Sequence, residues 1–155
     1  MADYRFVTLW RLAAPIEGVH EALREPCRWP DWWPGLCRVE ALPRGEGRRY
    51  RFLWRSRLGY RLRFEARVTR AEAPRLIEAE VRGDLEGLGR WTLDEAQGIT
   101  RVRYLWRVRT TPRWMNLAAP LVRPLFVWSH HAMMTAGAEG LARHLGARLL
   151  AAGRV

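Results

Sequence analysis

Four segments of the chain alternate between apolar and charged residues at every second position. In the clearest of them, residues 49–57, aromatic side chains fall on one side and arginines on the other. The other three span residues 60–68, 77–82 and 100–108, and a turn at residues 58–59 joins the first two into a hairpin. A period of two places alternate side chains on opposite faces of a strand. The pattern therefore predicts antiparallel strands with one buried face and one solvated face.

Two further segments favour strands. Residues 4–13 provide the first strand of the chain. Residues 85–93 form a weaker strand, in which Gly87 and Gly89 suggest either a bulge or a close approach of another group. Together these segments predict a meander of about six or seven antiparallel strands.

Two segments have helical character. Residues 15–23 begin with a proline at a first-turn position and carry apolar residues on one side, which predicts a short helix. Three prolines divide the apolar stretch after Thr111, and the chain from Leu125 to about Ala151 then contains none. A helix of roughly 27 residues spans ~40 Å, long enough to cross a small domain. Only this helix is long enough to cover the apolar face of the sheet.

Tryptophan and proline are concentrated between these two helices, in the segment Trp29-Pro30-Asp31-Trp32-Trp33-Pro34-Gly35. Proline fixes φ and lacks a backbone donor, while indole rings bring large apolar areas that must be buried. The segment predicts a tight helical turn that closes one end of a cavity. Because Trp32 and Trp33 are adjacent, we expect them to point in different directions, one over the cavity and one against the sheet.

Composition and charge restrict the class of protein. A length of 155 residues fits one domain, residues 1–155. The N-terminus has no signal-peptide pattern, no apolar run approaches the ~20 residues of a membrane span, and Cys27 and Cys37 lack metal-ligand spacing. We therefore expect a cytoplasmic protein with reduced thiols, and neither a metal nor a nucleotide cofactor is indicated.

All 27 basic residues are arginine, and the net charge is +11. A stacking platform for nucleic acid needs arginines and aromatic rings on the same face, whereas the alternation separates them. Nucleic acid is therefore not an expected partner. The sequence contains nothing that fixes an oligomeric state.

The order of elements and several short motifs resemble the START-like, or SRPBCC, superfamily. The similarity is closest to bacterial polyketide cyclase/dehydrase and lipid-transport proteins, which share the helix-grip fold of the birch pollen allergen. The motifs are residues 14–19, the tryptophan-rich turn followed by Val39-Glu40, residues 89–93, residues 98–102, and His131, Met134, Gly137 and Leu141. The resemblance implies an α+β helix-grip fold, with two short helices after the first strand and a sheet curved around a long C-terminal helix. It also implies an elongated apolar cavity that binds lipids, sterols, polyketides or other hydrophobic molecules.

Aromatic residues dominate the predicted inner face. More rings share this face than aliphatic side chains can close-pack around, which favours a ligand cavity. A helix and sheet that enclosed no space above about 300 Å³ would count against that interpretation. The predicted ligand-binding residues are Trp10, Trp32, Trp33, Tyr50, Phe52, Trp54, Tyr60, Phe64, Trp91, Tyr104, Trp106, Trp128, His131 and Met134.

An enzyme of the cyclase or dehydratase type is the first alternative. His131 lies on the apolar stripe of the terminal helix and is expected to project between helix and sheet, with His130 at the periphery. It could act as a base on a polyketone while Tyr50 or Tyr104 stabilises the enolate oxygen. A structural core histidine is the preferred interpretation, because only Asp31 and Glu139 are candidates for a carboxylate that could orient the ring.

Lipid exchange at a membrane surface is the second alternative. The arginine-rich face could contact anionic headgroups, or it could be the solvated exterior of the sheet. The apolar contact would come from Trp114, Leu117, Leu121, Leu125 and Phe126.

Overall fold

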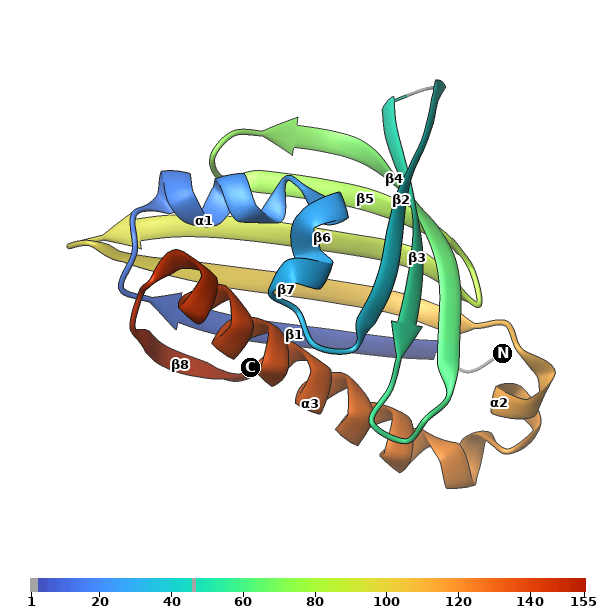
Figure 1. Cartoon of the computed structure of the whole chain (residues 1–155). Helices are drawn as coiled ribbons and strands as arrows, with labels where there is room; N and C mark the ends of the chain where they lie inside the picture. Colours follow the sequence, from blue (N-terminus) through green and yellow to red (C-terminus); the bar gives the residue numbers. More distant parts are fainter. Residues whose placement is uncertain (1–2, 46) are drawn as a thin grey trace.

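The computed structural model describes residues 3–45 and 47–155, in which eight antiparallel strands form one sheet (Figure 1). The strands are β1 (Asp3–Leu12), β2 (Leu36–Gly45), β3 (Gly47–Arg55), β4 (Arg61–Glu72), β5 (Leu76–Gly83), β6 (Leu85–Ala96), β7 (Ile99–Thr110) and β8 (Leu149–Arg154). They are arranged in the order β2-β3-β4-β5-β6-β7-β1-β8. The helices are α1 (Ile16–Leu23), the 3₁₀ helix η1 (Pro26–Asp31), α2 (Arg113–Leu117) and α3 (Ala119–Leu145).

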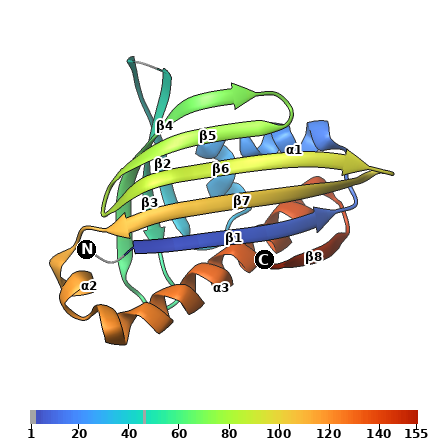
Figure 2. The same cartoon turned by 180° about the vertical axis from the view of Figure 1, so that it is seen from behind.

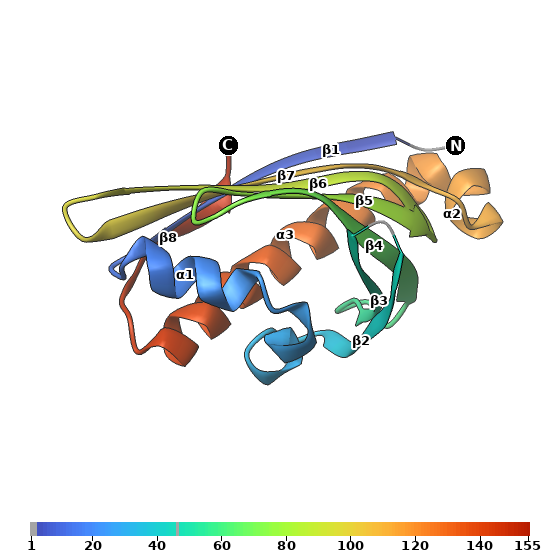
Figure 3. The ribbon, with the colours of Figure 1, turned by 90° about the horizontal axis from the view of Figure 1, so that it is seen from above.

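Helix α3 crosses the concave face of the sheet, while β2, β3 and β4 curl around its side (Figure 3). Helices α1 and η1 cover the rest of that face, and the opposite face is open (Figures 2 and 3). The buried residues of each strand follow the alternation in the sequence, as in β3, where Tyr50, Phe52 and Trp54 are buried. The predicted α+β helix-grip fold is confirmed, including the two short helices after the first strand.

The strand count and the limits of the long helix differ from the predictions. The sheet has eight strands rather than six or seven, because β2 and β8 also join it. Helix α3 has 27 residues but begins at Ala119 and ends at Leu145, where Gly146 adopts a left-handed conformation with φ of 62°. Pro120 lies in the first turn, where a missing N–H costs nothing, so the helix begins before Leu125. The residues after Gly146 pair with β1 as β8 instead of extending the helix.

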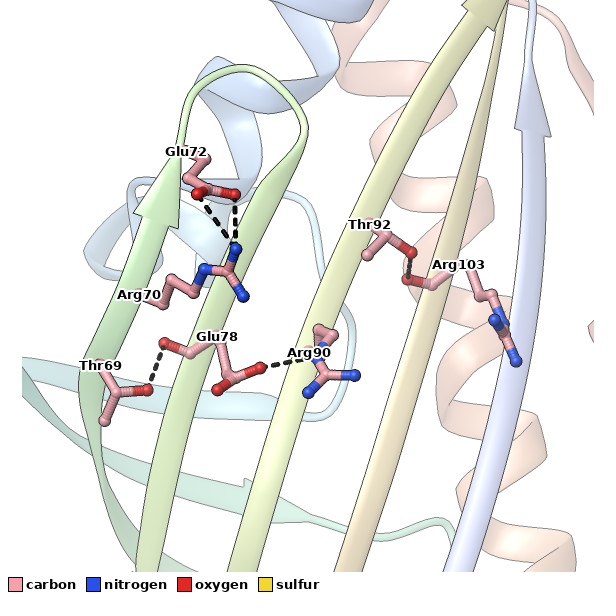
Figure 4. A network of polar contacts seen from close by, with 7 residues as sticks. All are labelled: Thr69, Arg70, Glu72, Glu78, Arg90, Thr92 and Arg103. Atoms are coloured by element: carbon pink, nitrogen blue, oxygen red, sulfur yellow. Dashed lines mark hydrogen bonds and ion pairs between the residues drawn. The ribbon is translucent and has the colours of Figure 1, made fainter.

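The outer face of the sheet carries ion pairs and polar contacts between and along strands (Figure 4). Arg90 Nε on β6 lies 2.6 Å from Glu78 Oε2 on β5, and Arg70 pairs with Glu72 at 3.1 Å. Thr69 donates to the carbonyl oxygen of Glu78 at 3.3 Å. Arg70 and Glu72 are open to water, where such a pair contributes about 0–1 kcal/mol, while Glu78 is 19% exposed. This part of the arginine-rich face is therefore a solvated exterior with internal charge compensation.

Candidate functional site

A cavity of about 120 Å³ lies between the concave face of the sheet and α3. This volume is below the 300 Å³ given above as the limit, so by that criterion it counts against a cavity that encloses a whole ligand of drug size. It is close to the ~150 Å³ of an engineered apolar cavity that binds benzene. The enclosed space thus fits one aromatic ring or a short acyl segment, and a larger ligand must extend through the mouth or move side chains.

Most of the predicted ligand-binding residues line this cavity. They come from the loop after η1, from β3, β4, β6 and β7, from the turn between β3 and β4, and from α3. They are Trp33, Tyr50, Phe52, Trp54, Tyr60, Phe64, Trp91, Tyr104, Trp106 and Met134. Alternation predicted the strand residues, because the cavity lies on the buried face of each strand.

Trp33 and Trp29 bring the tryptophan-rich turn into the cavity wall. The Nε1 of Trp33 donates to the carbonyl oxygen of Met133 on α3 at 2.9 Å, and that of Trp29 donates to Ala22 at 3.0 Å. Both rings are therefore fixed by a hydrogen bond at their polar edge and by packing elsewhere. Trp29 was missing from the predicted ligand-binding set, although its proximity to Trp33 in the sequence was a usable signal.

Trp33 lines the cavity and Trp32 does not, as expected for one member of the pair, but the expectation that the two rings point in different directions is wrong. The two indoles stack with ring centres 5.4 Å apart and planes 20° from parallel. The Trp32 ring also lies 6.3 Å from that of His144, so Trp32 anchors the turn to α3 rather than to the sheet. Its carbonyl oxygen occupies the space that a Cβ at Gly140 would need.

Trp10, Trp128 and His131 are also absent from the cavity wall. Trp10 is only 1% exposed and packs behind the wall against Trp33 and Trp91, with ring centres 5.7 and 5.4 Å away. Trp128 is 52% exposed. Together with His131 it lines a second pocket on another side of α3, beside β1 and β8, which has a volume of about 460 Å³ and is more open to solvent.

His130, and not His131, is the histidine of the cavity wall, so the sequence-based assignment of the two was wrong. Adjacent residues on a helix lie about 100° apart, and sequence alone did not fix the rotation of α3 against the sheet. The His130 ring stacks on Phe6 with centres 3.9 Å apart. Burial, with a smaller contribution from His131, lowers the pKa of His130 to about 3, so this ring is neutral at pH 7.

Tyr104 places a phenolic hydroxyl among the aromatic rings of the cavity. Its ring stacks on Trp91 with centres 4.0 Å apart, and burial raises the pKa of the hydroxyl, which stays protonated. A Cβ at position 89 would lie 2.9 Å from this hydroxyl and 3.0 Å from the Trp106 ring. Gly89 therefore makes room for Tyr104 and Trp106, and of the two expected roles for this glycine the close approach is confirmed.

Tyr60 and Ser129 form the polar part of the opposite wall. Burial raises the pKa of Tyr60, while the nearby hydroxyl groups of Ser129 and Ser56 oppose the shift. Ser129 is 1% exposed and lies on the face of α3 that lines the cavity. This wall therefore combines two hydroxyl groups with the surrounding rings.

The charged groups at the cavity are both cationic. Arg24 at the end of α1 and Arg48 on β3 belong to its wall, which contains no Asp or Glu among residues 3–45 and 47–155. Burial lowers the pKa of the nearby His20, and Arg24 and Arg48 lower it further. Arg48 lies six residues before Trp54 on β3, about 20 Å at the rise of a strand. The two arginines thus mark one end of the cavity, and Tyr60 marks the other.

The carboxylates considered as orienting groups for a histidine, Asp31 and Glu139, are both exposed. Within the described residues, no group of three His, Cys, Asp or Glu side chains is placed to hold a metal ion. The chemistry of the cavity therefore rests on aromatic surface, hydroxyl groups, one neutral imidazole and the two arginines.

Residues 6–146 match the sequence profile of a family described as polyketide cyclase / dehydrase and lipid transport. Among proteins of curated function, none matches the chain by sequence.

Solved structures share the fold at low sequence identity. The Zhui aromatase/cyclase from Streptomyces sp. R1128 has a TM-score of 0.78 at 16% identity, and the alignment covers 94% of each chain. A START superfamily protein from Mycobacterium smegmatis has a TM-score of 0.74 at 15% identity, covering 92% of this chain and 97% of that one. The major latex-like protein 151 of Panax ginseng has a TM-score of 0.69 at 7% identity, with the same coverage.

Proposed function

Because the chain belongs to the polyketide cyclase / dehydrase and lipid transport family, we propose that it binds a hydrophobic small molecule, with an aromatic or acyl portion, in the cavity beside α3. The observation that carries the proposal is the composition of the cavity wall. Aromatic and aliphatic side chains form nearly all of it, and only a few polar groups interrupt them. This is the usual make-up of a site for an apolar ligand.

The position of the two arginines suggests the polarity of the ligand. An apolar portion would lie among Trp91, Tyr104 and Trp33, while a polar end would face Arg24 and Arg48. Arg24 already has a carboxylate partner in Glu21, at 3.2 Å, whereas no ion pair involves Arg48 within the described residues. An amphipathic acid would therefore match the cavity better than a neutral molecule of the same shape.

Binding can be tested with two measurements. Native mass spectrometry of the purified protein would detect a retained ligand. Titration with N-phenyl-1-naphthylamine, a neutral dye that fluoresces in apolar surroundings, would report a free cavity, with a saturable increase expected. The proposal would be overturned if the protein retained no ligand and also showed no saturable dye binding.

A matched pair of variants assigns the signal to the cavity. Ala79→Trp places an indole in the cavity wall, and we expect it to weaken dye binding at least tenfold. Ala71→Trp places the same group on an exposed position of β4 and should leave binding within twofold of the original. Equal binding by both variants would mean that the dye binds elsewhere.

A cyclase- or dehydratase-type reaction is a second candidate, and Tyr104 is the observation that favours it. Its protonated hydroxyl could donate to a carbonyl oxygen of a bound polyketone and stabilise the enolate that forms on proton removal. The cavity offers a weaker candidate for the general base that would remove the proton. His131 lies outside the cavity, and His130, with a pKa of about 3, is a weak base at pH 7. Binding therefore remains the function with the better support.

A further inference from the structure

Large apolar side chains are exposed together at one end of the molecule. Leu58, Trp114, Leu117, Leu121 and Leu125 are 46%, 50%, 85%, 79% and 52% exposed, and we call these five residues the apolar end. Apolar side chains scattered over a surface need no explanation, but a contiguous group of this kind marks an interaction site. Phe126, which the sequence placed with them, is 3% exposed and belongs to the core.

Three elements bring the apolar end together. Trp114 and Leu117 lie on α2, Leu121 and Leu125 lie one turn apart on α3, and Leu58 is in the turn between β3 and β4. Tyr60 connects the elements, since its ring lies 5.9 Å from that of Trp114 and 6.3 Å from that of Phe126.

The charges around the apolar end are positive. Four arginines are exposed there: Arg57 in the same turn, Arg61 at the start of β4, Arg113 on α2 and Arg123 on α3. The sequence has no Asp or Glu between Glu95 and Glu139, so α2 and the first two thirds of α3 carry no negative charge. No ion pair within residues 3–45 and 47–155 involves Arg57, Arg61 or Arg113.

Asp3, beside Arg123, and Asp84, beside Thr111, are carboxylates that already have partners. Asp3 lies 3.8 Å from the Nε of Arg109, and Asp84 accepts a 2.8 Å hydrogen bond from the backbone N–H of Arg63. Arg123 donates to the carbonyl oxygen of Asp3 at 3.1 Å and lies over the Tyr4 ring, whereas Arg57, Arg61 and Arg113 remain available to an external anion.

We propose that the apolar end docks on the surface of a bilayer containing anionic phospholipids. Leucine and tryptophan side chains would enter the interfacial region, and the surrounding arginines would contact the headgroups. No helix within the described residues is both long and apolar enough to cross a membrane, so the contact is peripheral. A second copy of this chain is a poorer occupant, because it would bring a further set of unpaired arginines against the first.

Docking would bring one end of the cavity to the membrane. Tyr60 and Phe126 both line the cavity, and Tyr60 also adjoins the apolar end through its contact with Trp114. The docking surface itself does not depend on the proposed ligand, since it rests on other residues.

Vesicle flotation tests the docking. The purified protein is mixed at low salt with vesicles of phosphatidylcholine alone, or of phosphatidylcholine with 30% phosphatidylglycerol. We expect the protein to float only with the anionic vesicles. Most of this flotation should be lost in 0.5 M NaCl, because the screening length there is a few ångströms. Absence of flotation with anionic vesicles at low salt would overturn the proposal.

Two pairs of variants distinguish vesicle binding through the apolar end from binding through the overall positive charge of the protein. Leu117→Glu should reduce the vesicle partition coefficient more than tenfold, while Val155→Glu, at an apolar position 78% exposed elsewhere, should change it much less. The triple variant Arg57→Gln, Arg61→Gln, Arg113→Gln should likewise lose binding. Its control replaces Arg11, Arg103 and Arg107 on the outer sheet face with Gln and loses the same net charge.

Equal losses in the two members of either pair would show that total charge or another face is responsible, and would overturn the assignment. Light scattering provides a further check. Self-association of the original protein that Leu117→Glu abolishes would identify a second copy as the occupant and would also contradict the proposal.

Discussion

The indole ring of Trp33 lies against the backbone of α3 at Gly137, and its Nε1 donates a 2.9 Å hydrogen bond to the carbonyl oxygen of Met133 one turn earlier. A Cβ at position 137 would overlap this indole. The contact fixes the tryptophan-rich turn on the helix and sets the position of one wall of the cavity.

Gly137→Ala should therefore destabilise the protein, although alanine is the better helix former. Overpacking of this kind costs about 1–3 kcal/mol, against a gain of up to about 1 kcal/mol from helix propensity. Urea unfolding measures the net change. The matched control is Gly18→Ala in α1, where a Cβ meets no atom within 4 Å and a gain in stability is expected. A stabilising effect of both substitutions would mean that Trp33 is not held against Gly137.

The arginines at the cavity predict a preference for acids. We expect 2-naphthoate to bind about tenfold more tightly than the isosteric 2-naphthamide, which corresponds to ~1.4 kcal/mol. The double variant Arg24→Gln, Arg48→Gln should lose this preference and retain binding of the amide, whereas Arg28→Gln, at an exposed position of η1, should keep it. Quenching of tryptophan fluorescence gives both affinities. Equal affinities in the original protein would reject the acidic ligand and leave the binding function intact.

The pH dependence of stability should contain a contribution from His130. Its pKa is about 3 in the folded protein, against an ordinary value near 6.5, so in this interval the unfolded chain binds a proton that the folded chain does not. The neutral His130 therefore leaves the free energy of unfolding undiminished above about pH 6.5. Below that pH the free energy of unfolding falls by up to about 1.4 kcal/mol per pH unit.

This contribution can be isolated by comparison with His130→Phe, which keeps a ring to stack on Phe6. Urea unfolding of both proteins at pH 7.5, 6 and 5 cancels the titration of the other groups. We expect the original protein to lose more stability than the variant as the pH falls. If the free energies of unfolding of the two proteins changed with pH in parallel, His130 would be protonated in the folded state.

His131→Ala should leave the affinity for N-phenyl-1-naphthylamine within twofold of the original, because His131 lines only the second pocket, beside β8, and not the cavity. If a polyketone is converted, Tyr104→Phe should slow the reaction by ~10²–10³, as expected for loss of an oxyanion donor, and His131→Ala should not. Absorbance of the aromatic product follows the reaction. Loss of dye binding in His131→Ala would contradict the assignment of the cavity.

Local pattern was sufficient for much of the fold. The alternation at Tyr50, Phe52 and Trp54 defined both the strand and its buried face, because strand geometry fixes the direction of every second side chain. The same rule placed Tyr104 and Trp106 in the cavity wall. It did not predict β8, whose small residues become a strand only because the edge of β1 is available for pairing.

The sequence by itself determined which residues face the concave side of the sheet, and hence that the cavity is aromatic. Only the tertiary structure decided that His130 rather than His131 lines it, that Trp32 stacks on Trp33, and that the exposed leucines of two helices and a hairpin turn meet at one end. The physical reason is that strand alternation is a property of the local backbone. The rotation of a helix against a sheet, and the meeting of distant segments, are set by packing between residues far apart in the chain.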